Sequence, residues 1–236
     1  MKASINKRLL VCSELVRAGS VLADVGTDHA YLPIYLLEKG IIERAIASDI
    51  NQGPLNKARE NIERAGFIHK VELCLCNGAA ALSGAGATDY AVCGMGGELI
   101  AEIIEHAPHL KDKNINLILQ PMSKPEALRE YLYSNGFEIV KERYVTDTGK
   151  HYVCILARFS GVNTPFSDVD VHFGTDAAFK NAVSPELKVY MNEKLKSLTR
   201  TVEGKRVGGI DTEKETSLLS ALTERMKEID TERELV

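Results

Sequence analysis

The sequence lacks any long apolar run, and this absence limits the classes of protein it can encode. Within the 236 residues, the longest apolar stretches are far too short to span a bilayer. The first ten residues, MKASINKRLL, lack the apolar core of a secretory signal peptide. We therefore expect a protein with no membrane anchor that works in the cytoplasm.

Cysteine and net charge are also low. The five cysteines form an odd set without the density of a disulfide framework, which indicates reduced thiols. No cysteine or histidine cluster has metal-ligand spacing, so we expect no metal site. The net charge of −4 gives no global sign of nucleic-acid binding, although a local basic patch would be compatible with it.

Strands and helices alternate through the first 135 residues. Apolar runs predict strands at 21–25, 45–50, 71–76, 90–93 and 115–120. Helical patterns occur at 4–18, with Ser4 as a possible cap, and at 31–39, 54–65, 99–105 and 126–134. This order predicts an α/β fold with a mostly parallel sheet and helices on both faces.

The next two strands break that order. Residues 137–145 and 152–159 both resemble strands, and the segment between them is too short for a crossover helix. They are therefore expected to form an antiparallel hairpin. A parallel sheet that ends in an antiparallel hairpin is the usual plan of class I methyltransferases, whereas a classical dehydrogenase domain continues in parallel.

The C-terminal part has a different composition. Residues 160–183 give no clear pattern, and apolar residues then recur at helical spacing on both sides of a glycine-rich turn. We predict a helical hairpin at about 184–232, which divides the chain into residues 1–160 and 161–236. The hairpin is either a packing arm or a clamp whose basic residues, Lys205 and Arg206 among them, face phosphates.

The turn after the first strand is the most informative motif. Gly26 permits a tight turn and the close approach of a ligand. A dinucleotide-binding turn would need two more glycines, but Thr27, Asp28 and His29 follow instead. Together with Asp24, Asp28 suits a ligand with a cationic centre and an amino group, which describes S-adenosylmethionine. An ordinary strand–helix turn is the alternative.

Polar residues and glycines follow the other strands at the same sheet edge. Asp49 is placed to accept hydrogen bonds from ribose hydroxyls, and Asn77-Gly78 would lie beside an adenine ring or form a simple turn. The glycines of 94-GMGG-97 indicate close approach of a ligand or tight packing. Gln120 ends the fifth strand and presents an amide to this edge.

Three motifs together resemble one family. The segments ADVGTDHAYLP, VCGMGGELI and LILQPM are similar to those of the bacterial tRNA (adenine-N1)-methyltransferases that modify adenine 22. The resemblance covers the whole chain and implies a class I methyltransferase fold with a C-terminal helical hairpin. It also implies S-adenosylmethionine as the donor and tRNA as the acceptor.

The resemblance carries site roles to particular positions. It implies cofactor contacts at Gly26, Thr27, Asp28, His29, Asp49, Asn77, Gly78, Gly94, Met95 and Gly96. With Asp24 and Ile50 added, these residues form the predicted cofactor set. Two positions depart from the family pattern. Many members have an acid in place of Asn77, so the resemblance implies an adenine contact without that charge. Many have Asn in place of Met122. If that Asn orients the target base, this protein is expected to be slower, to act on a different target, or to bind its base through Gln120 instead.

Catalysis of this reaction needs positioning more than acid–base chemistry, because adenine N1 already has a lone pair. N1 lies on the pairing edge, so the base must be unpaired or extruded. We expect Gln120 to orient the base and Asp28 or His29 to accept a proton, with a structural role for His29 as the alternative.

Other functions remain possible at the level of sequence. Lys7 and Arg8 on the first helix are candidate contacts to tRNA phosphates, or simply solvated residues. A methyltransferase that acts on another RNA, on DNA or on a small molecule would share the same donor site. A non-catalytic nucleotide-binding module with a Rossmann-like fold would keep the pocket without the activity.

Overall fold

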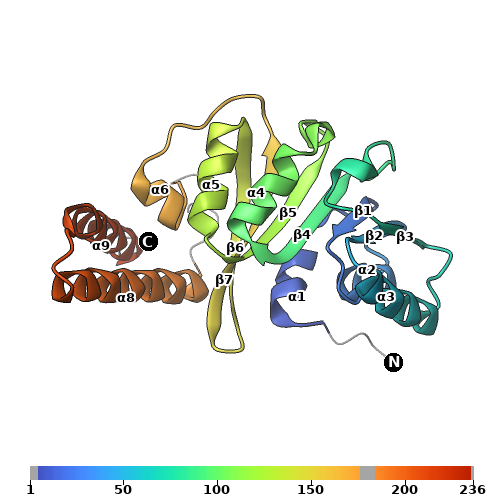
Figure 1. The fold of residues 1–236 in the computed structure, drawn as a ribbon, viewed down its shortest axis with the longest axis horizontal. Coiled ribbons are helices and arrows are strands. Elements are labelled where there is room, and N and C mark those ends of the chain that lie inside the picture. The colour runs from blue at the N-terminus through green and yellow to red at the C-terminus, as the bar shows by residue number, and fades with distance from the viewer. Residues whose placement is uncertain (1–4, 176–183, 235–236) are drawn as a thin grey trace.

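A seven-stranded sheet with the order β3-β2-β1-β4-β5-β7-β6 forms the centre of the molecule (Figure 1). The structure is a computed structural model that describes residues 5–175 and 184–234. β1 to β5 pair in parallel, while β7 pairs antiparallel with both β5 and β6. The strands are β1 (Val21–Val25), β2 (Arg44–Asp49), β3 (Val71–Leu75), β4 (Asp89–Gly96), β5 (Asn116–Ser123), β6 (Phe137–Asp147) and β7 (Lys150–Phe159).

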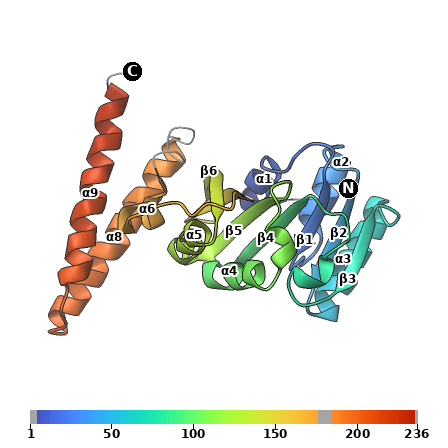
Figure 2. The ribbon, with the colours of Figure 1, turned by 90° about the horizontal axis from the view of Figure 1, so that it is seen from above.

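Helices cover both faces of the sheet, as the alternating pattern predicts (Figure 2). The helices of the first 135 residues are α1 (Lys7–Ser13), α2 (Tyr31–Glu38), α3 (Gln52–Ala65), α4 (Gly97–Glu105) and α5 (Pro125–Ser134), with short 3-10 turns at Ala80–Leu82 and Pro108–Leu110. The apolar faces of α1, α2 and α3 form one core cluster with the sheet. α4 and α5 pack on the opposite face in a second cluster.

The predicted antiparallel hairpin is confirmed, and its strands are longer than expected. Pairing continues from Phe137 opposite Phe159 to Asp147 opposite Lys150. Only Thr148 and Gly149 remain as the loop, with φ of 49° and 76°. Positive φ at both positions is what a tight hairpin turn with the right-handed strand twist requires. The hairpin therefore carries Asp147 to the end of its first strand.

Two predicted boundaries differ in ways that matter for the site. The first helix spans Lys7–Ser13 instead of 4–18, and Asn6 caps it by accepting a hydrogen bond from the Leu9 N–H at 2.9 Å. Ser4, the cap that the sequence suggests, lies outside the described residues. The fourth strand runs on to Gly96, because its pairing with β5 resumes beyond a bulge at Gly94.

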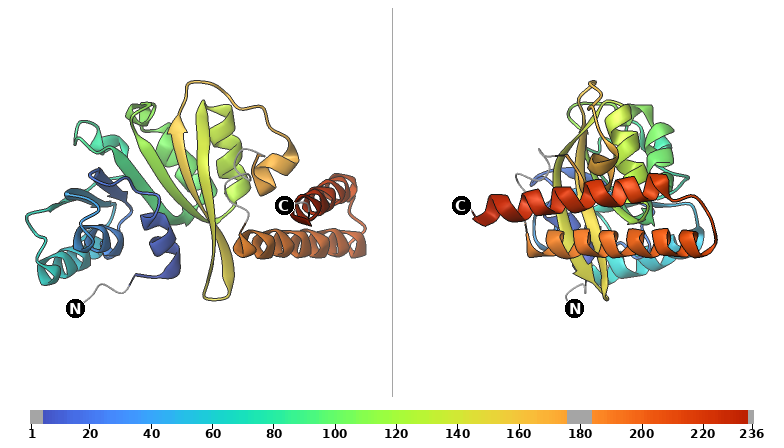
Figure 3. Two further views of the ribbon diagram at one scale, coloured as in Figure 1. Left: turned by 180° about the vertical axis from the view of Figure 1, so that it is seen from behind. Right: turned by 90° about the vertical axis from the view of Figure 1, so that its left-hand side faces the viewer.

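The C-terminal helices pack against the main sheet. α8 (Pro185–Val207) and α9 (Glu213–Glu234) lie side by side as the predicted hairpin (Figure 3). α6 (Asp168–Phe173), which the sequence left unassigned, begins with a capping box between Ser167 and Asp170. Leu187, Tyr190 and Leu222 belong to the same buried cluster as α4, α5 and the sheet. The sheet and the helical hairpin thus share one core.

A buried ion pair links the same elements. Arg129 and Glu142 are fully buried and joined at 2.8 Å, and Arg129 Nη1 also donates to the carbonyls of Val171 and His172. The guanidinium therefore satisfies carbonyls near the end of α6. Across the described ranges, no helix combines the length and apolar character needed to cross a bilayer.

Candidate active site at the carboxyl edge of the sheet

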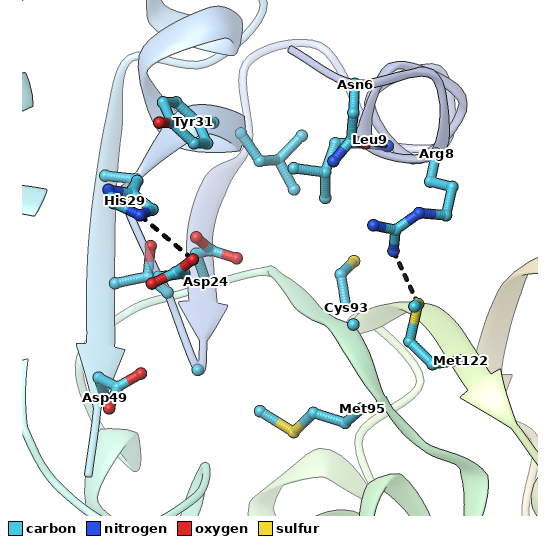
Figure 4. Close-up of a pocket in the computed structure, with 16 residues that line it drawn as sticks. Asn6, Arg8, Leu9, Asp24, His29, Tyr31, Asp49, Cys93, Met95 and Met122 are labelled. Atoms are coloured by element: carbon cyan, nitrogen blue, oxygen red, sulfur yellow. Dashed lines mark hydrogen bonds and ion pairs between the residues drawn. The ribbon is translucent and has the colours of Figure 1, made fainter. Parts of the chain in front are cut away.

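A cavity of about 460 Å³ opens at the carboxyl ends of β1, β2, β4 and β5 (Figure 4). β1 and β4 are neighbours, and the chain proceeds from them in opposite directions across the sheet. Such a switch point is where open α/β sheets bind ligands. The lining residues are Asn6, Arg8, Leu9, Asp24, Gly26, Thr27, Asp28, His29, Ala30, Tyr31, Leu32, Asp49, Cys93, Gly94, Met95 and Met122.

The turn after β1 is built around Gly26. Its φ is 76°, and a side-chain carbon added there would lie 2.0 Å from Met95 Cε. The N–H groups of Gly26 and Thr27 both donate to the Ser48 carbonyl, at 2.8 and 2.7 Å. These N–H groups are therefore not free to hold a phosphate. The geometry agrees with the prediction that this turn does not cradle a diphosphate.

Asp24 faces the cavity without a cationic partner among the described residues. The residue is 7% exposed, and burial raises the pKa of its carboxyl to about 6, with a further upward contribution from the charge of Asp49. The nearby Thr27 hydroxyl partly offsets this rise in pKa, although it forms no hydrogen bond of good geometry in the described chain. A buried acid and a buried hydroxyl are thus left to interact with a ligand.

Asp28, His29 and Tyr31 form the rim of the cavity next to this turn. His29 Nε2 lies 3.3 Å from Asp28 Oδ2, and the Asp28 side chain is largely exposed. The His29 ring stacks on Tyr31 with centroids 5.0 Å apart and an angle of 21° between planes. The Tyr31 ring is itself partly exposed. The rim therefore combines a carboxylate, an imidazole ring and an aromatic face.

Asp49 and the predicted adenine residues occupy different positions. Asp49 lines the main cavity, and its Oδ1 accepts a hydrogen bond from the Asn51 N–H at 2.7 Å. Asn77 and Gly78 line a separate pocket of about 220 Å³ beside α4, formed with Leu99, Glu102, Ile103 and His106 among others. Ile50, after β2, is exposed and lines neither pocket.

The glycines at positions 94–97 serve two separate purposes, lining the cavity and allowing close packing. Gly94 has a φ of 84° and lines the cavity with Met95. A side-chain carbon on Gly97 would lie 2.1 Å from the Lys124 carbonyl, so this glycine is needed for packing between the starts of α4 and α5. Gly96 approaches the Ser123 hydroxyl and does not line the cavity.

Gln120 is placed differently from the expectation that it contacts a base. Its side chain is fully buried and does not line the cavity. Its Oε1 accepts a hydrogen bond from Arg8 Nη1 at 2.8 Å, and its Nε2 donates to the Pro121 carbonyl at 2.9 Å. Arg8 occupies the cavity wall instead, because α1 packs over the end of β5.

The other basic residues predicted to bind RNA lie outside this cavity. Lys7 is exposed on α1. Lys205 forms an ion pair with Glu215 at 2.5 Å, and Arg206 donates to the Thr216 hydroxyl, so both residues join α8 to α9 near their turn. The described ranges hold no group of three or more metal-ligating side chains in a suitable arrangement.

The structure brings together eight of the predicted donor-site positions. They come from β1, the turn after it, β2 and β4, and are Asp24, Gly26, Thr27, Asp28, His29, Asp49, Gly94 and Met95. Sequence reasoning missed Asn6, Leu9 and Cys93 as lining residues. Tyr31 was also missed, although it lies within the same motif as His29. Nothing in the local sequence of α1 indicates that it closes a pocket formed by distant strands.

Known proteins similar to this chain are methyltransferases. Residues 5–155 match a family model described as a methyltransferase domain. The tRNA (adenine(22)-N(1))-methyltransferase of Bacillus subtilis is 29% identical over 228 residues, covering 94% of this chain and 94% of that protein.

Solved structures extend the likeness to the whole fold. A Streptococcus pneumoniae protein assigned as a tRNA (m1A22) methyltransferase, in complex with S-adenosyl-L-methionine, is 34% identical with a TM-score of 0.81. The match covers 94% of this chain and all of that one. The M. capricolum TrmK complex with S-adenosyl-homocysteine is 25% identical with a TM-score of 0.73, over 96% of each chain.

Proposed function

We propose, on the premise that the chain belongs to the methyltransferase domain family, that it transfers a methyl group from S-adenosylmethionine to N1 of adenine 22 in tRNA. The observation that carries this proposal is the acidic cavity at the switch point between β1 and β4. The B. subtilis relative with this activity matches nearly the full length, so the likeness includes the helical hairpin.

The cavity suits a zwitterionic sulfonium donor. Asp24 and Asp28 offer negative charge to an ammonium and a sulfonium group, and the unpaired Thr27 hydroxyl offers a further polar contact. S-adenosylmethionine, when bound, supplies an electrophilic methyl group. We assign Gly26, Thr27 and His29 to its methionine part. We further assign Asp49 to the ribose side, Asn77 and Gly78 to the adenine side, and Gly94 and Met95 to the region of the methyl group. Ile50 and Gly96 line neither pocket and are given no role in donor binding.

The acceptor base enters beside the aromatic rim. Stacking on aromatic side chains stabilises an unpaired base, and the Tyr31 ring next to His29 offers such a face. Because N1 attacks with its own lone pair, the residues need only hold the base in line with the methyl group. Asp28 or His29 then accepts the proton that leaves the exocyclic amine.

The remaining assignments follow from the same proposal. Residues 1–160 hold the donor and the acceptor base, and residues 161–236 contact more distant parts of the tRNA. Lys7, Lys205 and Arg206 are assigned to phosphate contacts. We place the reaction in the cytoplasm, with tRNA as the partner.

The direct test uses bulk tRNA from a strain that lacks the enzyme. Incubation with S-adenosylmethionine and this protein is expected to produce 1-methyladenosine, detected by mass spectrometry of nucleosides, and to leave a tRNA with guanine at position 22 unmodified. Asp28→Ala is expected to reduce methyl transfer, with donor affinity measured separately. No gain of 1-methyladenosine in tRNA, or transfer only to ribosomal RNA or DNA, would overturn the proposal.

A further inference from the structure

Arg8 contacts four side chains at the wall of the cavity, and one of them is Met122, whose Sδ accepts from Nη1 at 2.8 Å. Arg8 Nε donates to Asp147 Oδ2 at 3.1 Å, and its Nη1 donates to Gln120 Oε1 at 2.8 Å. The guanidinium carbon lies 5.1 Å from the centroid of the Tyr152 ring. These contacts remove the rotamer freedom that an arginine side chain otherwise keeps, so the cationic group is fixed before any ligand arrives.

The charge of Arg8 is unusual for this cavity. The lining contains the carboxylates of Asp24, Asp28 and Asp49, and among the described residues that form it Arg8 is the only lysine or arginine. Figure 4 shows the guanidinium pointing from α1 toward the cavity, above Cys93 and Met122. Within the described residues its Nη2 atom has no hydrogen-bond partner. The side chain therefore keeps donors for a negatively charged ligand.

Gln120 and Asp147 contact Arg8 from outside the cavity. The Gln120 amide is fully buried, and its Nε2 is bound to the Pro121 carbonyl, which leaves Oε1 facing the guanidinium. Asp147 is 8% exposed and lies at the end of β6, so the tip of the hairpin supplies the counter-charge. Neither residue lines the cavity.

We propose that Arg8 binds an oxyanion in this cavity and that Gln120 and Asp147 are positioning residues that act through it. This inference rests on the proposed function, because that reaction brings two oxyanions close to the cavity. One is the carboxylate in the methionine part of the donor, and the other is a phosphate beside the acceptor nucleotide. A guanidinium binds either group through paired N–H bonds. Without the charge of Arg8, the carboxylates of the lining would repel both groups.

The first arm of the test measures ligand binding without RNA. Calorimetry compares S-adenosylhomocysteine with 5′-methylthioadenosine, which lacks the amino-acid part, on the wild-type protein and on Arg8→Met. If the oxyanion is the donor carboxylate, Arg8→Met weakens S-adenosylhomocysteine about 10- to 100-fold and leaves methylthioadenosine unchanged.

The second arm measures methyl transfer to tRNA at saturating donor. If the oxyanion is a phosphate, Arg8→Met lowers kcat/KM for tRNA by a similar factor, and the affinity of S-adenosylhomocysteine stays unchanged. The slope of log affinity for tRNA against log salt concentration then falls by about one. Either pattern supports an oxyanion site. If neither arm changes, the assignment of Arg8 is overturned.

A double-mutant cycle tests the positioning role. Gln120→Met is expected to lower the same parameter as Arg8→Met, and to have no further effect in the Arg8→Met background. Independent, additive effects would contradict action through Arg8. Asp147→Asn keeps an oxygen that can accept from Nε, so it is expected to lose less than Asp147→Ala. A role confined to stability would not produce this order in ligand affinity.

Two controls keep the outcomes separate. Arg44→Met removes an arginine from the amino end of β2, and it is expected to leave both arms unchanged. The conservative variant Arg8→Lys keeps the charge without the fork and serves if Arg8→Met does not fold. If wild-type protein binds S-adenosylhomocysteine but forms no 1-methyladenosine, the proposed function fails while the first arm still decides the role of Arg8.

Discussion

Asp24 is predicted to favour function at the expense of stability. Burial, with a contribution from Asp49, raises the pKa of this carboxyl from 3.8 to about 6. Folding therefore favours the protonated form, and the ionised form that predominates at pH 7 costs stability. At about 1.36 kcal/mol per pKa unit, the cost is ~3 kcal/mol at pH 7, and it disappears as the pH falls through 6 toward 3.8.

The variant Asp24→Asn cannot ionise at this position. Without donor at pH 7, its free energy of unfolding is expected to exceed that of the wild type by up to about 3 kcal/mol, with the difference closing near pH 4. Donor affinity is expected to fall at least tenfold, because the ammonium loses a charged partner. In the wild type, the same affinity should decline as the pH drops through 6.

Urea unfolding at pH 7 and pH 4, followed by circular dichroism, measures the first effect. Asp89→Asn is a matched control, because Asp89 is also buried but accepts hydrogen bonds from the N–H and Nε of Arg17. That variant is expected to lose stability at pH 7. If Asp24→Asn is also less stable than the wild type at pH 7, the reasoning from burial is refuted.

Three further predictions test other parts of the site and fold. Gly26→Ala forces an unfavourable φ and displaces Met95, so it should lower the free energy of unfolding by about 1–3 kcal/mol. It should also abolish S-adenosylhomocysteine binding in calorimetry. Unchanged affinity would contradict a close approach of the ligand to Gly26. Arg129→Met leaves the Glu142 carboxylate buried without a cationic partner, and should lower the free energy of unfolding by about 3–5 kcal/mol, with partial recovery on adding Glu142→Gln. Tyr31→Ala should lower kcat/KM for tRNA about tenfold without changing donor affinity, and Tyr31→Phe should retain activity. Equal loss in both variants would argue against stacking of the acceptor base on the Tyr31 ring.

Much of the fold could be predicted because the sequence patterns that mark its strands and helices are local. Apolar runs and helical periods mark the strands and helices from residue 21 to residue 159, and the short connection after β6 identifies the antiparallel hairpin. The errors lie at the ends of elements. β4 continues to Gly96 because backbone pairing with β5 overrides the glycines, a tertiary effect that composition does not reveal.

The site was predictable where it depends on one motif or on strand ends. Asp24 to His29 cover the end of β1 and the turn after it, and Asp49 ends the neighbouring strand, so the parallel topology alone brings them together. The contacts of Arg8 join residues 112 and 139 positions apart in the chain, through the packing of α1 on β5 and β6. No local pattern encodes such contacts, which is why Gln120 was expected to face a ligand.

The shared core of the sheet and the helical hairpin limits how this protein can be divided. A chain cut at residue 160 would expose the surface on which Leu187, Tyr190 and Leu222 pack, and would remove the carbonyls that satisfy Arg129. Such a fragment is expected to aggregate or to require a replacement cover. For the same reason, we expect that exchanging the C-terminal hairpin for that of another protein would destabilise the fold. The hairpin has to change together with the side chains of α5 and the strands beneath it.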